Sequence, residues 1–235
     1  MNATVVIPTY NERDNLAGLI PAVLAYPGYN VIVVDDDSPD GTGALADTLA
    51  EQAGGRLSVI HRTGARGLGR SLVAGLQRAL TTDADLIFQM DADFSHDPQY
   101  LPAMAAATGD ADLVLGSRYL QGVSVVNWPL HRIILSSFAN RYIRAILGLE
   151  VTDCTTGFRC WRREALARLP IDAMVSNGYA FLVEMLFEAS RRGCRIAEVP
   201  IIFIERRQGQ SKVSGRVLAE SLIVPWRLRF RGRTP

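Results

Sequence analysis

Short apolar runs alternate with helix-forming segments through the first half of this 235-residue chain, and this alternation constrains the fold more than any other feature. The run at residues 31–34 is β-branched throughout and shows no polar alternation, which is typical of a strand buried on both faces. Strands that alternate with helices at intervals of roughly 25–30 residues form right-handed βαβ units. We therefore predict an α/β fold with a mostly parallel sheet flanked by helices. The predicted strands span residues 4–8, 31–34, 57–60, 86–90 and 113–116.

Helical spacing of apolar residues predicts the helices between these strands, and it predicts further helices in the second half of the chain. The first helix begins near Asn11 or Asp14, which are candidate N-caps, and ends before Pro27. No linker rich in glycine or serine and no internal repeat interrupts the chain, so we expect a single domain over residues 1–235. The other predicted helices span residues 42–52, 68–80, 98–108, 130–147, 180–192 and 214–226, with a loop at 122–129, a turn into a strand at 155–158 and two strands around Pro200.

Composition narrows the class of protein. The chain is 48% hydrophobic, enough for a sizeable core, and its formal net charge of +1 provides no field that would attract nucleic acid. Cys154, Cys160 and Cys194 show no CxxC pattern and are expected to be reduced core residues. We expect no signal peptide, because no basic n-region precedes the first predicted strand. We expect no transmembrane helix, because prolines and a glycine interrupt the longest charge-free run.

Two carboxylates, Asp91 and Asp93, follow the strand predicted at residues 86–90. In α/β sheets, ligands bind outside the carboxyl ends of the strands. Hard oxygen donors at this spacing suit a Mg²⁺ or Mn²⁺ ion that also holds substrate phosphates. Aspartates are equally common in solvated turns after strands, so the pattern alone leaves both interpretations open.

Two other predicted strands also end in polar residues, at 8–12 and 35–37. Because parallel strands place their carboxyl ends at one edge of a sheet, we expect these segments to meet Asp91 and Asp93 there. Like charges repel, and a bound cation or the hydrogen-bond donors of a ligand relieve the repulsion. Asp35 or Asp36 would then accept from a ribose or a base.

Further polar segments have two interpretations each. Residues 64–70 are either a weak phosphate nest or a flexible turn, and they do not match a P-loop. Residues 206–212 form a polar loop that either orders over an anionic ligand or stays solvated. Glu184 either contributes to a site or lies on a solvated helix face. Cations near strand or loop ends are Arg118, Arg132, Arg159, Arg206 and Lys212.

Taken in order along nearly the whole chain, six motifs resemble the GT-A family 2 glycosyltransferases, and within them the dolichol-phosphate (polyprenol-phosphate) mannosyltransferases. The resemblance implies transfer of mannose from GDP-mannose to a polyprenyl monophosphate on the cytoplasmic face of a membrane. It also implies a nucleotide-sugar and metal half at residues 1–118 and an acceptor half at 119–235. The motifs occupy residues 6–12, 34–42, 90–96, 116–119, 156–159 and 206–212.

The resemblance implies roles for individual residues. Asp91 and Asp93 would bind Mg²⁺ or Mn²⁺ on the pyrophosphate, beside the backbone of Ala92, and with Arg118 they would be the catalytic residues. Ser95 stands in the donor site where some relatives have a glutamine as a third metal ligand, and Leu182 also stands where many relatives have glutamine. The guanosine would be held by Pro8, Tyr10, Glu12, Val34 and Asp36, the donor or acceptor phosphates by Arg118, Arg206 and Lys212, and the acceptor phosphate by Arg132 and Ser211.

The mechanism expected for such an acceptor follows from its charge. A phosphate monoester is already anionic near neutral pH, since its second pKa is about 6, and it needs no strong general base. Its oxygen would attack the anomeric carbon while GDP departs, with the metal and basic side chains stabilising the leaving pyrophosphate. A single in-line displacement inverts that carbon, so we expect a β-linked mannosyl phosphate.

The last predicted helix suggests how the chain meets its lipid. An apolar side of this helix is followed by alternating arginines, and basic residues beside an amphipathic helix suit a membrane surface. The alternative is a helix packed on the domain with a basic tail. We expect a protein peripheral to the cytoplasmic face of the membrane, or one that depends on a separate membrane-anchoring protein. The apolar side comprises Val217, Leu218, Leu222, Ile223 and Trp226, and the arginines are Arg227, Arg229, Arg231 and Arg233.

Three other functions remain open on the sequence. The first is transfer of glucose or another sugar from a UDP donor. The second is a receiver-like signalling domain in which an acidic cluster binds Mg²⁺ and accepts a phosphoryl group. The third is a nucleotide-binding module without catalysis, although Asp91 and Asp93 argue against it.

Overall fold

The computed structural model describes residues 1–174, 176, 178–205 and 215–231, and gives the side chains of the last helix from residue 222 onward. The first half contains β1 (Ala3–Thr9), α1 (Arg13–Leu24), β2 (Tyr29–Asp35), α2 (Thr42–Gln52), β3 (Leu57–His61), α3 (Leu68–Leu80), β4 (Leu86–Gln89), a 3₁₀ turn (Pro98–Tyr100), α4 (Leu101–Ala107) and β5 (Leu113–Ser117). The second half contains β6 (Val125–Val126), α5 (Leu130–Leu147), β7 (Arg159–Arg162), α6 (Arg163–Ala167), a 3₁₀ turn (Ile171–Ala173), α7 (Tyr179–Arg191), β8 (Ile196–Pro200), β9 (Phe203–Ile204) and α8 (Gly215–Phe230).

Within the described residues, seven strands form one twisted sheet in the order β3-β2-β1-β4-β7-β5-β8. All neighbouring pairs are parallel except those of β7, which runs antiparallel to both β4 and β5. The predicted α/β fold with a mostly parallel sheet is therefore confirmed. Strands β6 and β9 form a separate parallel pair.

The direction of β7 determines which segments meet. Because β4 and β5 are both antiparallel to β7, they are parallel to each other, and their carboxyl ends lie at the same edge as those of β1 and β2. The amino end of β7 lies at that edge as well, so the loop that precedes β7 joins the strand ends that carry the acidic motifs.

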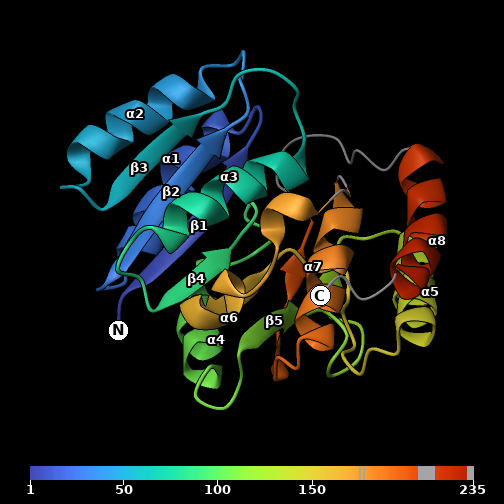
Figure 1. Cartoon of the computed structure of the whole chain (residues 1–235). Helices are drawn as coiled ribbons and strands as arrows, with labels where there is room; N and C mark the ends of the chain where they lie inside the picture. The colour runs from blue at the N-terminus through green and yellow to red at the C-terminus, as the bar shows by residue number, and fades with distance from the viewer. Residues whose placement is uncertain (175, 177, 206–214, 232–235) are drawn as a thin grey trace.

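Helices cover both faces of the sheet, and β1 and β2 contribute alternate residues to two hydrophobic clusters (Figure 1). On one face Val6 and Val34 pack with α3, and on the other Val5 and Val33 pack with α1 and α4. The run predicted to be buried on both faces is so, since residues 31–34 are all buried. Helix α3 lies very close to the sheet at Gly75, where a Cβ atom would sit 2.3 Å from Val6 Cγ1.

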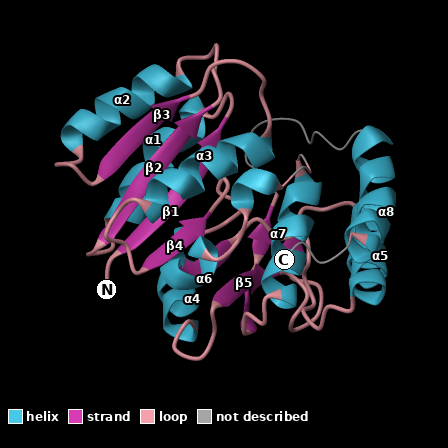
Figure 2. Cartoon of the chain, viewed as in Figure 1, coloured by secondary structure: helices cyan, strands magenta, loops and turns pink. Residues whose placement is uncertain are grey.

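Several local predictions need correction. The N-cap of α1 is Glu12 rather than Asn11 or Asp14, because the Glu12 carbonyl accepts the first helical hydrogen bond, from the Leu16 N–H at 2.9 Å, and Asp14 lies inside the helix. Residues 122–129 are not entirely a loop, since they include β6. The last helix continues to Phe230, with Pro225 inside it, and packs against α5 and α7 (Figures 1 and 2). In the part of the chain that is described, no helix combines the length and apolarity needed to cross a bilayer.

Candidate active site

The carboxylate of Asp91 lies just beyond β4 and is supported from behind by a buried histidine. The backbone N–H of Asp91 donates to Nδ1 of His96 at 2.9 Å, and His96 is only 2% exposed. The Asp91 side chain itself is 39% exposed. Gly157 lies directly against it, because a Cβ atom at Gly157 would be 3.4 Å from Asp91 Oδ1. Asp91 therefore faces the solvent with its position fixed on two sides.

Asp93 is buried, and its orientation is set by its neighbours in the turn. Its Oδ1 accepts from the backbone N–H of Ser95 at 3.1 Å and from the Ser95 hydroxyl at 2.5 Å. Between them Phe94 has a φ of 60°, a conformation that is uncommon for a bulky residue and often found at functional sites. Ser95 thus orients the Asp93 carboxylate, a role that the sequence motif did not indicate.

The chemistry of these donors fits a divalent cation that is shared with a substrate. Among the described residues, no group of three or more histidine, cysteine or acidic side chains is arranged to hold a metal. Mg²⁺ and similar ions are commonly held by one or two carboxylates together with substrate phosphates. Asp91 and Asp93, one residue apart after the same strand, provide such a pair.

At the ends of β1 and β2, the residues predicted to hold a guanosine occupy different depths. Tyr10, Pro8 and Glu12 are partly exposed, whereas Val34 has no exposed surface and lies beneath the edge. The Asp36 carboxylate is buried, is paired with Nη1 of Arg62, and accepts from the backbone N–H of Gly67 at 2.7 Å.

Asp35, the alternative acceptor for a ribose or base, is used within the protein. Its carboxylate accepts from the Ser38 hydroxyl at 2.5 Å and from Thr9 Oγ1 at 3.2 Å. These bonds join the ends of β1 and β2, so Asp35 supports the shape of the edge. The carboxylate of Asp36, in contrast, is held by Arg62 and Gly67, which both lie in the segment after β3.

Residues 62–67 follow β3, and the sequence pattern predicts part of this segment only to be a phosphate nest or a flexible turn, so sequence reasoning missed its contacts with the ends of β1 and β2. The backbone N–H of Gly67 donates to Asp36, so that amide is used by a carboxylate rather than presented as part of a phosphate nest. Arg66 reaches across to Tyr10, with its Cζ 4.6 Å from the centre of the Tyr10 ring. Two arginines within the six residues after a predicted strand were the available signal, because β3 ends at the same edge as β1 and β2.

Arg118, at the end of β5, is held by a buried carboxylate. Its Nε and Nη2 each donate to Asp153 at 2.7 Å, and Nη2 also donates to Thr155 Oγ1 at 2.7 Å. Burial alone would raise the pKa of Asp153, but the charge and hydrogen bonds of Arg118 outweigh it and keep the pKa below its usual range. Among the described residues, no side chain or carbonyl accepts from Nη1 of Arg118.

A wall of aromatic rings connects the acidic and the basic parts of the site. His96 lies 5.8 Å from Phe203, edge to face, and Phe203 lies 5.5 Å from Cζ of Arg118. The ring centres of Trp128 and Phe203 are 5.4 Å apart. Arg132 stacks on Trp128, with its Cζ 4.0 Å from the Trp128 ring centre. Arg132 is also paired with Glu205. A continuous series of ring contacts therefore links the segment that carries Asp91 to Arg118 and Arg132.

The loop at residues 153–157 contacts both the acidic part of the site, at Asp91, and the basic part, at Arg118. Asp153 and Thr155 hold Arg118, while Gly157 lies against Asp91. Arg159, fully buried, donates from Nε to the Thr156 carbonyl at 2.9 Å and from Nη2 to the Cys154 carbonyl at 3.4 Å. Burial lowers the pKa of Arg159 to about 10, partly offset by the charge of Asp153, so the guanidinium stays charged at neutral pH and fixes this loop from inside.

The remaining predicted residues lie deeper or outside the described residues. Leu182 is buried in the core, and Glu184 is fully buried, accepting from the Ser176 N–H at 3.0 Å and from Arg231 Nη1 at 2.5 Å. The interpretation of Glu184 as part of a solvated face is therefore wrong. Arg206, Ser211 and Lys212 fall within residues 206–214 and lie outside the described residues.

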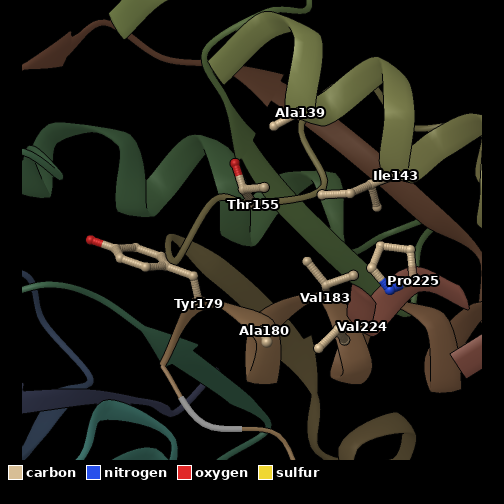
Figure 3. A pocket seen from close by; sticks show the side chains of 8 residues that line it. All are labelled: Ala139, Ile143, Thr155, Tyr179, Ala180, Val183, Val224 and Pro225. Atoms are coloured by element: carbon tan, nitrogen blue, oxygen red, sulfur yellow. The ribbon is translucent and has the colours of Figure 1, made fainter. Parts of the chain in front are cut away.

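An apolar hollow, lined in part by Thr155, opens between α5, α7 and α8 (Figure 3). It is small, with a volume of about 30 Å³, and Thr155 and Tyr179 carry its polar groups. The same threonine hydroxyl accepts from Arg118, so the hollow adjoins the basic part of the site. Its lining residues are Ala139, Ile143, Thr155, Tyr179, Ala180, Val183, Val224 and Pro225.

Comparison with known families identifies the class of enzyme. Residues 4–169 match the model for "Glycosyl transferase family 2". The chain belongs to glycosyltransferase family 2. It is therefore a glycosyltransferase, which excludes the receiver-like signalling domain and the nucleotide-binding module without catalysis.

Two curated relatives of this family 2 enzyme extend over nearly its full length. It is 44% identical over 231 residues to polyprenol monophosphomannose synthase of Mycolicibacterium smegmatis, covering 97% of this chain and 87% of the relative. It is 44% identical over 224 residues to undecaprenyl-phosphate mannosyltransferase of Micrococcus luteus, covering 95% and 92%. The family suggested by the sequence motifs is confirmed.

Solved structures agree on the GT-A fold. Glucosyl-3-phosphoglycerate synthase of Mycobacterium tuberculosis, in a complex with Mn²⁺, UDP and its product, superposes with a TM-score of 0.68 at 21% identity, covering 97% of this chain and 79% of that one. A second complex of the same synthase, with Mn²⁺, UDP and phosphoglyceric acid, gives a TM-score of 0.69 at 20% identity, covering 97% and 78%. At this identity the likeness establishes the fold.

Proposed function

We propose that this family 2 glycosyltransferase transfers mannose from GDP-mannose to a polyprenyl monophosphate. The observation that carries the proposal is the contact chain from Asp91 through His96 and Phe203 to Arg118, which sets a pair for a divalent cation beside a basic group. A donor pyrophosphate and an acceptor phosphate need neighbouring sites of these two kinds. Both relatives, a polyprenol monophosphomannose synthase and an undecaprenyl-phosphate mannosyltransferase, are named for mannosylation of a polyprenyl phosphate.

In this proposal the residues at the strand ends have separate roles in binding the metal, the guanosine and the phosphates. Asp91 and Asp93 would hold Mg²⁺ or Mn²⁺, which when bound would offset the charge that develops on the leaving pyrophosphate. Tyr10 and Glu12 face the guanosine at the end of β1, and Pro8 and Val34 shape the edge beneath it. Asp36 is the proposed guanosine ligand at the end of β2, where Arg62 and Gly67 hold its carboxylate. Arg206, Ser211 and Lys212 remain proposed phosphate-binding residues on sequence grounds.

Arg118 and Arg132 orient the acceptor. Nη1 of Arg118 binds a phosphate oxygen while Asp153 fixes the rest of the guanidinium, and Arg132 approaches from the first turn of α5. The acceptor oxygen is ionised already, so positioning two anions together is the main task of the protein. Attack from the face opposite the leaving GDP gives a β-linked mannosyl phosphate.

A donor assay tests the proposal directly. With a short polyprenyl phosphate and Mg²⁺ or Mn²⁺, we expect release of GDP from GDP-mannose and formation of a mannosylated lipid, with negligible turnover of UDP-glucose. Chromatography of the nucleotide and mass spectrometry of the lipid are the measurements. Faster turnover of UDP-glucose than of GDP-mannose would assign the enzyme to the UDP-sugar alternative.

The surface that would meet the lipid is formed by α5 and α8 together. Tyr142 of α5 donates its hydroxyl to the Leu222 carbonyl of α8 at 3.0 Å and accepts from Trp226 Nε1 at 2.9 Å. Val224 and Leu228 are buried beneath, so α8 is packed on the domain and still exposes apolar side chains. The exposed residues of this α5–α8 face are Leu130, Ile134, Leu135 and Phe138 with Leu222, Ile223, Trp226 and Phe230.

Exposed apolar residues gathered in this way mark an interaction site, and exposed Arg227 and Arg229 on the same helix favour an anionic membrane surface. We infer that this face rests on the cytoplasmic leaflet, which makes the enzyme a peripheral membrane protein. The hollow beside Thr155 opens between the same helices, next to the proposed acceptor site. Val217, Leu218 and Arg233, part of the sequence prediction, fall outside the described side chains.

Binding to lipid vesicles tests the membrane affinity of the α5–α8 face independently of catalysis. We expect Ile134→Ser combined with Phe230→Ser to weaken binding to phosphatidylglycerol-containing vesicles by about 30-fold, because each side chain contributes on the order of 1 kcal/mol when buried in the interface. Ile202→Ser is the control, since Ile202 is 52% exposed but belongs to the β8–β9 connection. Equal binding by the double variant and the wild type would refute the assignment of this face.

A further inference from the structure

Arg66 occupies a position between the two segments proposed to receive the nucleoside. Its Nη1 donates to the Tyr10 hydroxyl at 2.8 Å, at the end of β1. Its Nη2 donates to the Asp37 carbonyl at 2.9 Å and to the Asp37 carboxylate at 3.2 Å, at the end of β2. The next residue, Gly67, donates its N–H to Asp36. Arg66 is thus adjacent to Tyr10 and Asp36, both proposed guanosine ligands.

The interactions of Arg66 contribute little to the stability of the fold. Its side chain is 47% exposed and that of Asp37 is 70% exposed, and exposed ion pairs of this kind contribute roughly 0–1 kcal/mol. Arg62, four residues earlier, is different: it is mostly buried and paired with buried Asp36. The guanidinium of Arg66 can therefore exchange its partners for a ligand at small cost, while Arg62 holds the edge together.

A guanidinium at this place distinguishes bases by their acceptors. Its two parallel N–H groups match O6 and N7 of guanine, which are adjacent acceptors. Uracil offers O4 without a second acceptor beside it, and adenine places a donor next to its N7. We propose that Arg66 is a specificity residue of the donor site, donating to the O6/N7 edge of a guanine base. This inference rests on the proposed GDP-mannose donor and adds to it the group that selects the base.

Nucleotide binding by calorimetry, with Mg²⁺ present, tests the inference on the whole chain. We expect Arg66→Ala to weaken GDP binding by about tenfold to a hundredfold and to leave the weaker binding of UDP unchanged. Arg66→Lys recovers little, because an ammonium cannot make the planar two-pronged contact. Arg70→Ala is the matched control: Arg70 is exposed on the same segment and donates to the Ala65 carbonyl at 3.3 Å.

A modified ligand identifies the atom that is recognised. In 7-deaza-GDP the N7 acceptor is missing, so the wild type should bind it more weakly than GDP, and Arg66→Ala should bind the two nucleotides equally. Two results would refute base recognition by Arg66 and leave the proposed function intact. One is that Arg66→Ala loses equal affinity for GDP and UDP, and the other is that it loses equal affinity for GDP and 7-deaza-GDP. A wild-type preference for UDP over GDP would overturn the proposed donor itself, and the role of Arg66 with it.

Discussion

Replacing Asp91 or Asp93 with alanine should abolish metal-dependent transfer, lowering kcat/KM by about 10³-fold or more, while the protein remains folded. The reason is that the two carboxylates are the proposed protein ligands of the cation, and the lost stabilisation of charge on the leaving pyrophosphate amounts to several kcal/mol. Neither side chain fills the core: Asp91 is 39% exposed, and Asp93 bonds within its own turn. Steady-state kinetics and thermal unfolding are the measurements.

Asp97→Asn is the control for both variants. Asp97 lies in the same segment, and its carboxylate accepts from the backbone N–H of Gln99 at 2.9 Å, an interaction that an asparagine oxygen can also make. We expect near wild-type activity from it. Binding of GDP with and without Mn²⁺ gives a readout apart from turnover: the gain in affinity due to the metal should disappear in Asp91→Ala. Full activity in either alanine variant would disprove the metal assignment.

Asp153→Ala should lower the free energy of unfolding by about 3–5 kcal/mol at neutral pH, since it leaves the buried charge of Arg118 without its partner. Urea denaturation measures the loss. Combining it with Arg118→Met removes both charges and should restore a large part of the stability without restoring activity. A double variant as unstable as Asp153→Ala would show that packing rather than the ion pair dominates.

The same pair gives a pH dependence of defined sign. Because the pKa of Asp153 is lower in the folded than in the unfolded protein, its stabilisation is complete above the unfolded value of about 3.9 and is lost as the pH falls further, through the folded value. The wild type should therefore lose more stability between neutral pH and about pH 3 than Asp153→Asn does. Identical acid profiles would contradict this.

Local sequence patterns were sufficient for most of the fold. Helices α2, α3 and α5 have the predicted bounds, and the convergence of the ends of β1, β2 and β4 follows from their parallel order. The antiparallel β7 was harder to place. Its four residues include Arg159 and Trp161, whose burial depends on distant partners such as the Gln89 side chain, which accepts from Trp161 Nε1 at 2.8 Å.

Site residues were predictable where a motif carried them and missed where long-range contacts define them. Asp153 has no local pattern, and only the folded chain brings it to Arg118, 35 residues away. The helical spacing at Glu184 left a site role and a solvated face equally open, because its partner Arg231 comes from the distant end of α8. Arg66 was hidden within a segment that resembled a phosphate loop, and its contact with Tyr10 spans 56 residues.

The reversed strand β7 has a geometric consequence for catalysis. Its preceding loop enters the sheet where the neighbouring strands leave it, so one stretch of five residues touches both Asp91 and Arg118. If the proposed sites are correct, the separation between the sugar donor and the lipid phosphate is set by this short covalent spacer, which Arg159 stiffens. In the proposed function, this spacer keeps the two anionic substrates at a fixed separation along one edge of the sheet.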